Sequence, residues 1–197
     1  MKILVIGATG TIGRAVADVL GTEHEVIRAS RHGSTRVDLE IPASLDVLFA
    51  TVGTVDAVIC CAASGQLTPL ASPSDDAFTL GLKGKLLGQV ALLRRSVDHV
   101  RDGGSITLTS GIFQEPTPGS SFGALVNAGL EAFVRAAAIE LPRGLRVNVV
   151  SPGWVTETLE KLGLDPRGGT PVGVVAHAYI KAVIGQMQGQ TLTPSPR

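Results

Sequence analysis

Cysteine and the larger aromatic residues are scarce in this chain of 197 residues, which holds two cysteines, one tyrosine and one tryptophan. The cysteines, Cys60 and Cys61, are adjacent in the sequence. Without a second, separated pair they provide neither a disulfide framework nor a zinc site. We therefore predict two reduced, packed thiols, no metal site and a cytoplasmic setting.

Long apolar runs and an excess of one charge are missing as well. No uninterrupted apolar stretch reaches the roughly 18 residues of a membrane span. The 17 basic and 17 acidic residues balance, which leaves no broad basic surface for nucleic acid. The opening stretch MKILVIGATG runs from a short apolar segment into a glycine turn and lacks a signal-peptide pattern. We expect one domain over residues 1–197 that binds a small molecule, with no nucleic acid and no membrane as partner.

Strand and helix patterns alternate along the chain. Apolar runs predict strands at 3–6, 25–29, 37–39, 55–61, 105–109, 145–150 and 190–193. Helical patterns lie at 11–20, 45–50, within 74–99, and at 122–141 and 171–186. Apolar strands separated by helices predict an α/β fold of Rossmann-like, doubly wound type, with a mainly parallel seven-stranded sheet and helices on both faces. The Pro- and Gly-rich segments 65–74, 114–123 and 163–173 are expected as loops at the carboxyl edge of the sheet, where such folds bind ligands.

Residues 7–13, GATGTIG, follow the first predicted strand and open the first helix. Gly7 would allow a tight turn, Gly10 would let a pyrophosphate approach the backbone, and Gly13 would let helix and strand pack closely. The free N–H groups at the start of the helix would then face the phosphates. The turn predicts a dinucleotide site that also includes Thr9, Thr11 and Ile12.

The spacing of these glycines, and motifs along nearly the whole chain, resemble the short-chain dehydrogenase/reductase family. ICCAAS at 59–64 stands where the family has its N-N-A-G turn, and GGSITLTSG at 103–111 matches the strand that ends in the catalytic serine, here Ser110. SPGWVTET at 151–158 matches the turn beside the nicotinamide, and GQMQGQTLTP at 185–194 resembles the closing strand. The resemblance implies an oxidoreductase whose further cofactor contacts are Asp38, Cys61, Ala62, Ala63, Pro152, Gly153 and Val155.

The segment RASRHG at 28–33 bears on which nicotinamide cofactor is bound. A carboxylate after the second strand would bind a ribose hydroxyl and favour NAD. Ser30 and Arg31 stand there instead, and a guanidinium suits the 2′-phosphate of NADP because it donates two hydrogen bonds. We predict NADP, with NAD possible; Arg28 or Arg36 could serve in place of Arg31.

The proton-transferring pair of the family is missing. The family places a tyrosine about 13 residues after its serine and a lysine four residues later, on one helix face. Counted from Ser110, these positions hold Gly123 and Asn127, and the family's supporting asparagine is replaced by Gly81. The single tyrosine, Tyr179, lies after the proline–glycine turn. Of that catalytic set, Ser110 alone remains.

Two functions stay open on this basis. In the first, an NADP(H)-dependent oxidoreductase moves hydride to or from a small carbonyl, alcohol or activated alkene. Ser110 would bind the substrate oxygen, and the proton would come from Lys85 or from water held by Ser110 and Asn127. Lys85 shares a helix face with Gly81 but could also be an ordinary surface lysine. In the second, the protein binds NADP(H) as a sensor or scaffold without turnover.

Assembly into a homodimer or homotetramer is a further expectation. The helix within 74–99 carries Gly81, Gly84 and Gly88, and the helix at 122–141 is rich in alanine. Small residues let helices approach closely, and the family resemblance points to the same helices as subunit contacts.

Overall fold

A seven-stranded sheet forms the centre of the protein in the computed structural model, which describes residues 1–63, 65, 67–71, 75–76 and 81–195. The strand order is β3-β2-β1-β4-β5-β6-β7, and each neighbouring pair is parallel. The strands are β1 Lys2–Ile6, β2 Glu25–Ser30, β3 Thr35–Arg36, β4 Val55–Cys60, β5 Val100–Thr109, β6 Arg146–Val150 and β7 Thr191–Leu192. The predicted parallel α/β sheet is therefore confirmed.

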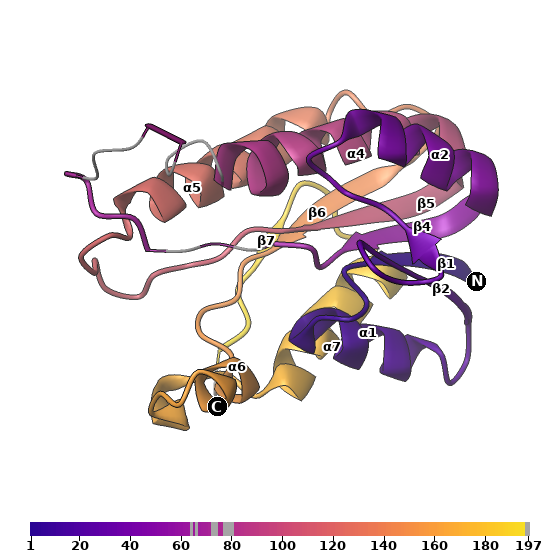
Figure 1. Cartoon of the computed structure of the whole chain (residues 1–197). Coiled ribbons are helices and arrows are strands. Elements are labelled where there is room, and N and C mark those ends of the chain that lie inside the picture. The colour runs from indigo at the N-terminus through magenta and orange to yellow at the C-terminus, as the bar shows by residue number, and fades with distance from the viewer. Residues whose placement is uncertain (64, 66, 72–74, 77–80, 196–197) are drawn as a thin grey trace.

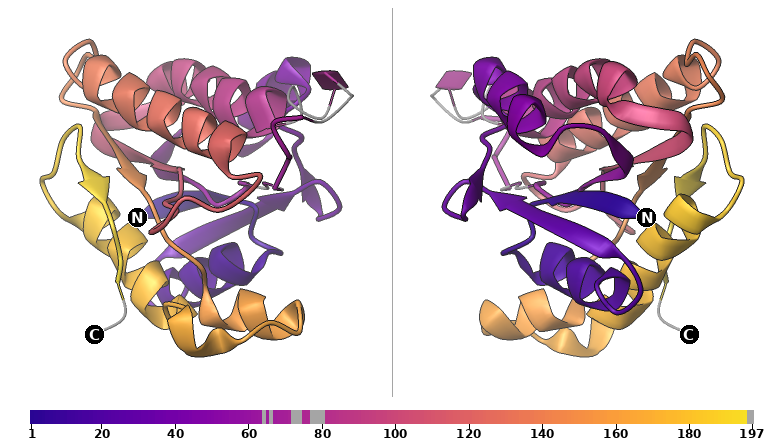
Figure 2. Two further views of the ribbon diagram at one scale, coloured as in Figure 1. Left: turned by 90° about the vertical axis from the view of Figure 1, so that its left-hand side faces the viewer. Right: turned by 90° about the vertical axis from the view of Figure 1, so that its right-hand side faces the viewer.

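Helices cover both faces of this sheet (Figure 1). On one face lie α1 (Thr11–Leu20) and α7 (Val172–Ile184), which share a buried core with β1 and β4. On the other lie α2 (Pro42–Val52), α4 (Gly88–His99) and α5 (Ser121–Ala137), whose core includes side chains of β5 and β6. The end-on views show the two layers above and below the strands (Figure 2). The inner strands β1, β4 and β6 are buried almost throughout on both sides, which explains their continuous apolar character.

The strand order reverses beside β1, which lies between β2 and β4. At such a switch point the loops that leave the carboxyl ends of two strands diverge to opposite faces and leave a crevice for a ligand. The glycine turn follows β1 directly at this point. The fold thus puts the predicted dinucleotide turn where an open α/β sheet binds its ligand.

The segment 37–39, predicted as a strand, is irregular and leads into a turn that the Ile41 N–H closes on the Asp38 carbonyl at 3.1 Å. The strand pairing with β2 occurs earlier, at Thr35–Arg36. Ser44 then binds Asp38 twice: its hydroxyl accepts from the Asp38 N–H at 3.0 Å and donates to the Asp38 carbonyl at 2.6 Å. The backbone N–H and carbonyl of Asp38 are thus hydrogen-bonded to the Ser44 side chain and are not available to a neighbouring strand.

Other boundaries also differ from the sequence expectation. The helix predicted at 122–141 ends at Ala137, since Leu141 precedes Pro142 and a residue before proline disfavours the helical conformation. The predicted start of the long helix, at 74, lies outside the described residues; from Leu82–Leu87 the chain forms a π-helical segment, η1, that continues into α4. A short helix, α6 (Thr156–Lys161), and a 3-10 turn, η2 (Pro166–Gly168), were not predicted.

The glycines of η1 and α4 are packed against their own chain. A Cβ on Gly88 would lie 2.7 Å from the Leu39 carbonyl oxygen, and one on Gly84 would lie 3.0 Å from a carboxylate oxygen of Glu40. A neighbouring backbone therefore does approach this helix closely. Gly88 is buried within its own subunit, so it offers no free surface for a second one.

Within the described residues, no helix is both long and apolar enough to span a bilayer.

Candidate functional site

Two glycines of the 7–13 turn are required by close backbone approach. Gly7 has a φ of +81°, and a Cβ there would lie 2.6 Å from the Ala62 backbone nitrogen. A Cβ on Gly13 would lie 2.1 Å from the Gly7 carbonyl oxygen. Any side chain at either position would clash with backbone that cannot move aside. The turn therefore leaves backbone N–H groups open at the start of α1, as a phosphate site requires.

A cavity of about 290 Å³ opens beside this turn, between the ends of β1, β2 and β4. Its wall includes His32 and Glu40, which were not predicted. Nine of the predicted cofactor residues also line it: Gly7, Thr9, Gly10, Ser30, Arg31, Asp38, Cys61, Ala62 and Ala63. The sequence prediction for the adenosine side of the site thus corresponds to one continuous cavity.

Ser30 and Arg31 stand at the end of β2 in this cavity. Ser30 is 6% exposed, and its hydroxyl oxygen is buried without a hydrogen-bond partner among the described residues. Arg31 is exposed and lines the same space. Arg28 instead donates to Asp18 at 2.7 Å. An orphaned hydroxyl beside a free guanidinium is a donor set that fits a phosphate group.

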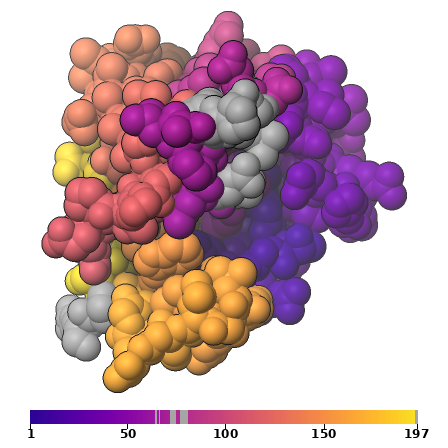
Figure 3. Space-filling view, turned by 60° about the vertical axis from the view of Figure 1, so that its left-hand side comes forward, coloured from indigo at the N-terminus to yellow at the C-terminus, as the bar shows by residue number. Residues whose placement is uncertain are grey.

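A second cavity, of about 340 Å³, adjoins the first through Ala63, which lines both. It is lined by the side chains at the ends of β5 and β6, and Phe113, Trp154 and Thr158 complete the wall. The predicted residues in it are Ile12, Lys85, Ser110, Asn127, Pro152, Gly153 and Val155. The loop after β5 and the segment containing α6 appear together on this side of the molecule in Figure 3.

Thr11 and Gly13 line neither cavity. Thr11 lies at the first position of α1, and its hydroxyl accepts a hydrogen bond from the Lys161 ammonium of α6 at 2.9 Å. Gly13 is buried against the glycine turn. Both therefore shape the start of α1 rather than the wall of a cavity.

Lys85 reaches into the second cavity from η1. A Cβ on Gly111 would lie 3.5 Å from the Lys85 ammonium and 3.4 Å from the Asn127 side-chain nitrogen. The two nitrogens thus lie close to one point in the cavity wall. The lysine therefore places its charge beside the residue that occupies the family's lysine position. Burial lowers the pKa of Lys85 from 10.5 to about 8, partly opposed by the negative charge of Glu131. At that value the amine exchanges its proton readily near neutral pH.

The backbone under Lys85 is fixed by Gln89, a fully buried residue of α4. Its amide nitrogen donates to the Lys85 carbonyl at 2.7 Å and to the Thr109 carbonyl at 2.8 Å, and its oxygen accepts from the Thr109 N–H at 2.8 Å. One side chain thus ties η1 to the end of β5, immediately before Ser110. These hydrogen bonds fix the backbone of Lys85 relative to the backbone just before Ser110.

Ser110 donates its hydroxyl proton to Glu131 at 2.8 Å. Gly123, Asn127 and Glu131 follow one another at four-residue spacing on α5, so they form one row on one helix face. Sequence reasoning stopped at Asn127 and missed Glu131. The same spacing, carried one turn further, would have found it.

An aromatic ring faces the position where the family has its tyrosine. A Cβ on Gly123 would lie 3.1 Å from two ring atoms of Phe113. The single tyrosine offers no substitute, because Tyr179 is fully buried and its hydroxyl pairs with Thr109 at 2.6 Å. Burial also raises the pKa of Tyr179 well above its usual value. No phenol therefore lines the second cavity.

Comparison with known proteins gives the family. The family model described as enoyl-(acyl carrier protein) reductase matches residues 10–168. The protein lin1944 from Listeria innocua is 36% identical, with a TM-score of 0.92 over 98% of both chains. The chain belongs to the short-chain dehydrogenase/reductase family. The chain matches no curated protein.

Two of the similar solved structures are complexes with a nicotinamide cofactor. A small-chain dehydrogenase in complex with NADPH is 25% identical, with a TM-score of 0.85 over 98% of this chain and 95% of that one. A short chain dehydrogenase from Burkholderia cenocepacia in complex with NADP is 20% identical, with a TM-score of 0.81 over 98% and 96%. At 20% identity, the similarity to the Burkholderia cenocepacia protein establishes the fold alone.

Proposed function

We propose that this member of the family is an NADP(H)-dependent oxidoreductase with an atypical active site. It would transfer hydride to or from a small carbonyl, alcohol or activated alkene. The observation that carries the proposal is the Lys85 ammonium, which shares one cavity with Ser110 and Asn127 at the carboxyl end of β5. A buried cation beside the position of the missing pair would be a specific replacement for the lost acid.

The adenosine-side cavity supports NADP(H) as the cofactor. The Ser30 hydroxyl is buried without a partner, and Arg31 is free beside it. Together they would hold the 2′-phosphate, while the backbone N–H groups at the start of α1 would hold the diphosphate. The complex of a 25% identical relative with NADPH is consistent with this choice.

The chemistry assigned to the residues is simple. Ser30, Arg31 and the N–H groups at the start of α1 would hold the reduced cofactor, whose nicotinamide would supply the hydride for the substrate carbon. The Ser110 hydroxyl lies at the end of β5 and would orient the substrate oxygen. Lys85 would then give a proton from its ammonium to that oxygen, and solvent would reprotonate the neutral amine. For oxidation of an alcohol the neutral amine would take the proton instead.

A panel of small ketones, aldehydes and activated alkenes, assayed by consumption of NADPH, tests this function. We expect turnover on at least one class, and Lys85→Met should reduce it about 10²- to 10⁴-fold, the usual contribution of a positioned acid. Lys83→Met, which alters an exposed lysine two residues away, is the matched control and should have no effect. Cofactor binding by both variants should be unchanged.

The alternative is an NADP(H)-binding sensor or scaffold. It is favoured by Gly123 and Asn127, which replace both proton-transferring residues of the family while the glycine turn is intact. Tight NADPH binding without turnover on any class of the panel would support this second function and contradict the first.

We further propose a homodimer or homotetramer in a cytoplasmic setting. Large apolar side chains are exposed at Leu87 on η1, at Leu125 on α5 and at Ile139 just after α5, and a subunit contact would cover them. The free thiols of Cys60 and Cys61 suit a reducing compartment. Light scattering at micromolar concentration tests the assembly, and a particle of 20.3 kDa would contradict it.

A further inference from the structure

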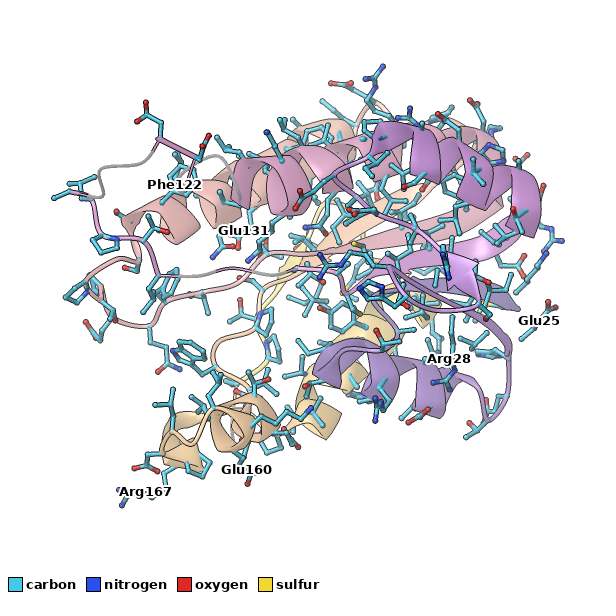
Figure 4. All side chains as sticks on the ribbon, viewed as in Figure 1. Glu25, Arg28, Phe122, Glu131, Glu160 and Arg167 are labelled. Atoms are coloured by element: carbon cyan, nitrogen blue, oxygen red, sulfur yellow. The ribbon has the colours of Figure 1, made fainter. Side chains whose placement is uncertain are left out.

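Glu131 stands directly behind the Ser110 hydroxyl. It lies on the sheet-facing side of α5 (Figure 4), and its carboxylate accepts the Ser110 proton at 2.8 Å. While this bond is made the serine oxygen can accept a hydrogen bond from a substrate alcohol, and to donate to a carbonyl oxygen the hydroxyl would have to turn away from Glu131. The hydrogen bond therefore fixes the direction in which Ser110 faces the cavity that it lines.

Lys85 comes from a different element but lies within the influence of the same carboxylate. The η1 segment packs against α5. The negative charge of Glu131 acts on the Lys85 ammonium and favours its protonated form, against the effect of burial. Among the described residues the Lys85 ammonium has no hydrogen bond and no direct ion pair, so the negative charge of Glu131 is what offsets its burial.

The other charged residues of the surrounding elements cannot take this role, because their side chains are exposed to solvent, where charges are screened. The exposed ones on η1 and α4 are Lys83, Arg94 and Asp98, on the segment before α2 it is Glu40, and on α5 it is Arg135. Arg95 of α4 is less exposed but is paired with Asp46 at 2.6 Å. The polar side chains around the end of β5 carry no charge: they are Thr109, Ser110, Gln89 and Asn127. Glu131 is thus the one acidic side chain that links the serine to the lysine within the described part of the chain.

We propose that Glu131 is a positioning residue of this site, holding the Ser110 hydroxyl by a hydrogen bond and the Lys85 ammonium by its charge, so that both groups stay at the wall of the one cavity that they line. The proposal rests on the function proposed above in naming Lys85 as the proton donor. Glu131 itself does not touch the substrate. On α5 the ionisable residue is thus Glu131, one helical turn beyond position 127, and the cation of the site comes from Lys85 on η1.

The ionisation of Lys85 can be measured without substrate or cofactor. The chain has five lysines. Reductive methylation with carbon-13 gives each of them a resolved NMR signal, and Lys85→Arg identifies the one that belongs to Lys85. In the wild-type protein we expect this signal to titrate with a midpoint of about 8. Glu131→Gln keeps an oxygen that accepts from Ser110 but removes the charge, and it should lower the midpoint by at least about half a pH unit, on the order of a threefold change in the equilibrium.

Three controls separate the outcomes. Glu140→Gln makes the same change at an exposed glutamate just beyond α5 and should leave the midpoint unchanged. Glu131→Asp retains the charge one methylene further away and should give an intermediate midpoint, which keeps the test available if the glutamine variant folds poorly. A role confined to holding Ser110 would leave the Lys85 titration unmoved in both Glu131 variants, and that result would overturn the proposal. A shifted titration in a protein that turns over no substrate would contradict only the proposed function.

Discussion

The ring of Phe113 faces Gly123 at the position where a side chain of residue 123 would begin, with two ring atoms 3.1 Å from that point. Restoring the family's tyrosine therefore requires that this ring move. Restoring the lysine at 127 would also place a second ammonium beside that of Lys85, which is unfavourable for two like charges.

These contacts predict how the family's acid pair can be rebuilt. The double variant Gly123→Tyr, Asn127→Lys should reduce simple ketones little better than the wild type. Adding Phe113→Ala and Lys85→Met should raise that activity at least about tenfold, within the 10²- to 10⁴-fold range of positioned acids. The control carries Gly123→Phe in the same background and lacks only the hydroxyl. Equal activity of this control, with melting temperatures matched, would show that the phenol does not act as the acid.

Arg31 should determine the preference for NADPH over NADH. A hydrogen bond to a charged group contributes about 1.5–3 kcal/mol, so we expect NADPH to bind roughly 10- to 150-fold more tightly. Arg31→Ala should remove most of this preference in a binding titration. Arg28→Ala is the matched control, because Arg28 is already paired with Asp18 at 2.7 Å. Tighter or equal binding of NADH by the wild type, or an equal loss in the Arg28 variant, would refute the assignment.

The parts of the molecule that sequence could predict are those with a periodic apolar signal. The continuous apolar strands and the helices between them were sufficient for the sheet and its two covered faces. The irregular segment at 37–39 was missed because its outcome depends on a hydrogen bond from Ser44, which a local apolar pattern does not reveal. Glu131 was missed for a related reason: its role depends on how closely α5 packs on the end of β5. Lys85 was predicted from the sequence as a proton donor, but the closeness of its ammonium to Asn127 on α5 could be found only in the structure.

Lys85 should make the folded protein less stable than it would be with an apolar residue. Burial lowers its pKa from 10.5 to about 8, so below about pH 8 the folded state carries the whole cost of a buried ammonium, and the cost fades as the pH rises toward 10.5. Lys85→Met should therefore raise the free energy of unfolding at neutral pH by about 1–3 kcal/mol. Denaturant unfolding at pH 7 and again near pH 10 should show the gain shrinking. A constant gain at both pH values, or the same gain in the exposed Lys83→Met control, would contradict this origin.

The contact between Lys161 and Thr11 predicts a contribution to cofactor binding. The Lys161 ammonium of α6 reaches the first residue of α1, where the diphosphate would meet the helix. An exposed charge of this kind contributes about 0.5–1 kcal/mol, so Lys161→Met should weaken NADPH binding roughly two- to fivefold at low salt. The difference should disappear at high ionic strength. Lys181→Met, on exposed α7 surface, is the control and should bind as the wild type does.

The single tryptophan of the chain gives this site a built-in optical reporter. Trp154 is 48% exposed and forms part of the wall of the second cavity, which Lys85 also lines. Its indole would therefore stand next to a nicotinamide bound in that cavity. Indole emission overlaps the absorption of the reduced nicotinamide ring but not of the oxidised one. Energy transfer from Trp154 would therefore follow the redox state of a bound cofactor during a single turnover, in unlabelled protein and with no knowledge of the substrate.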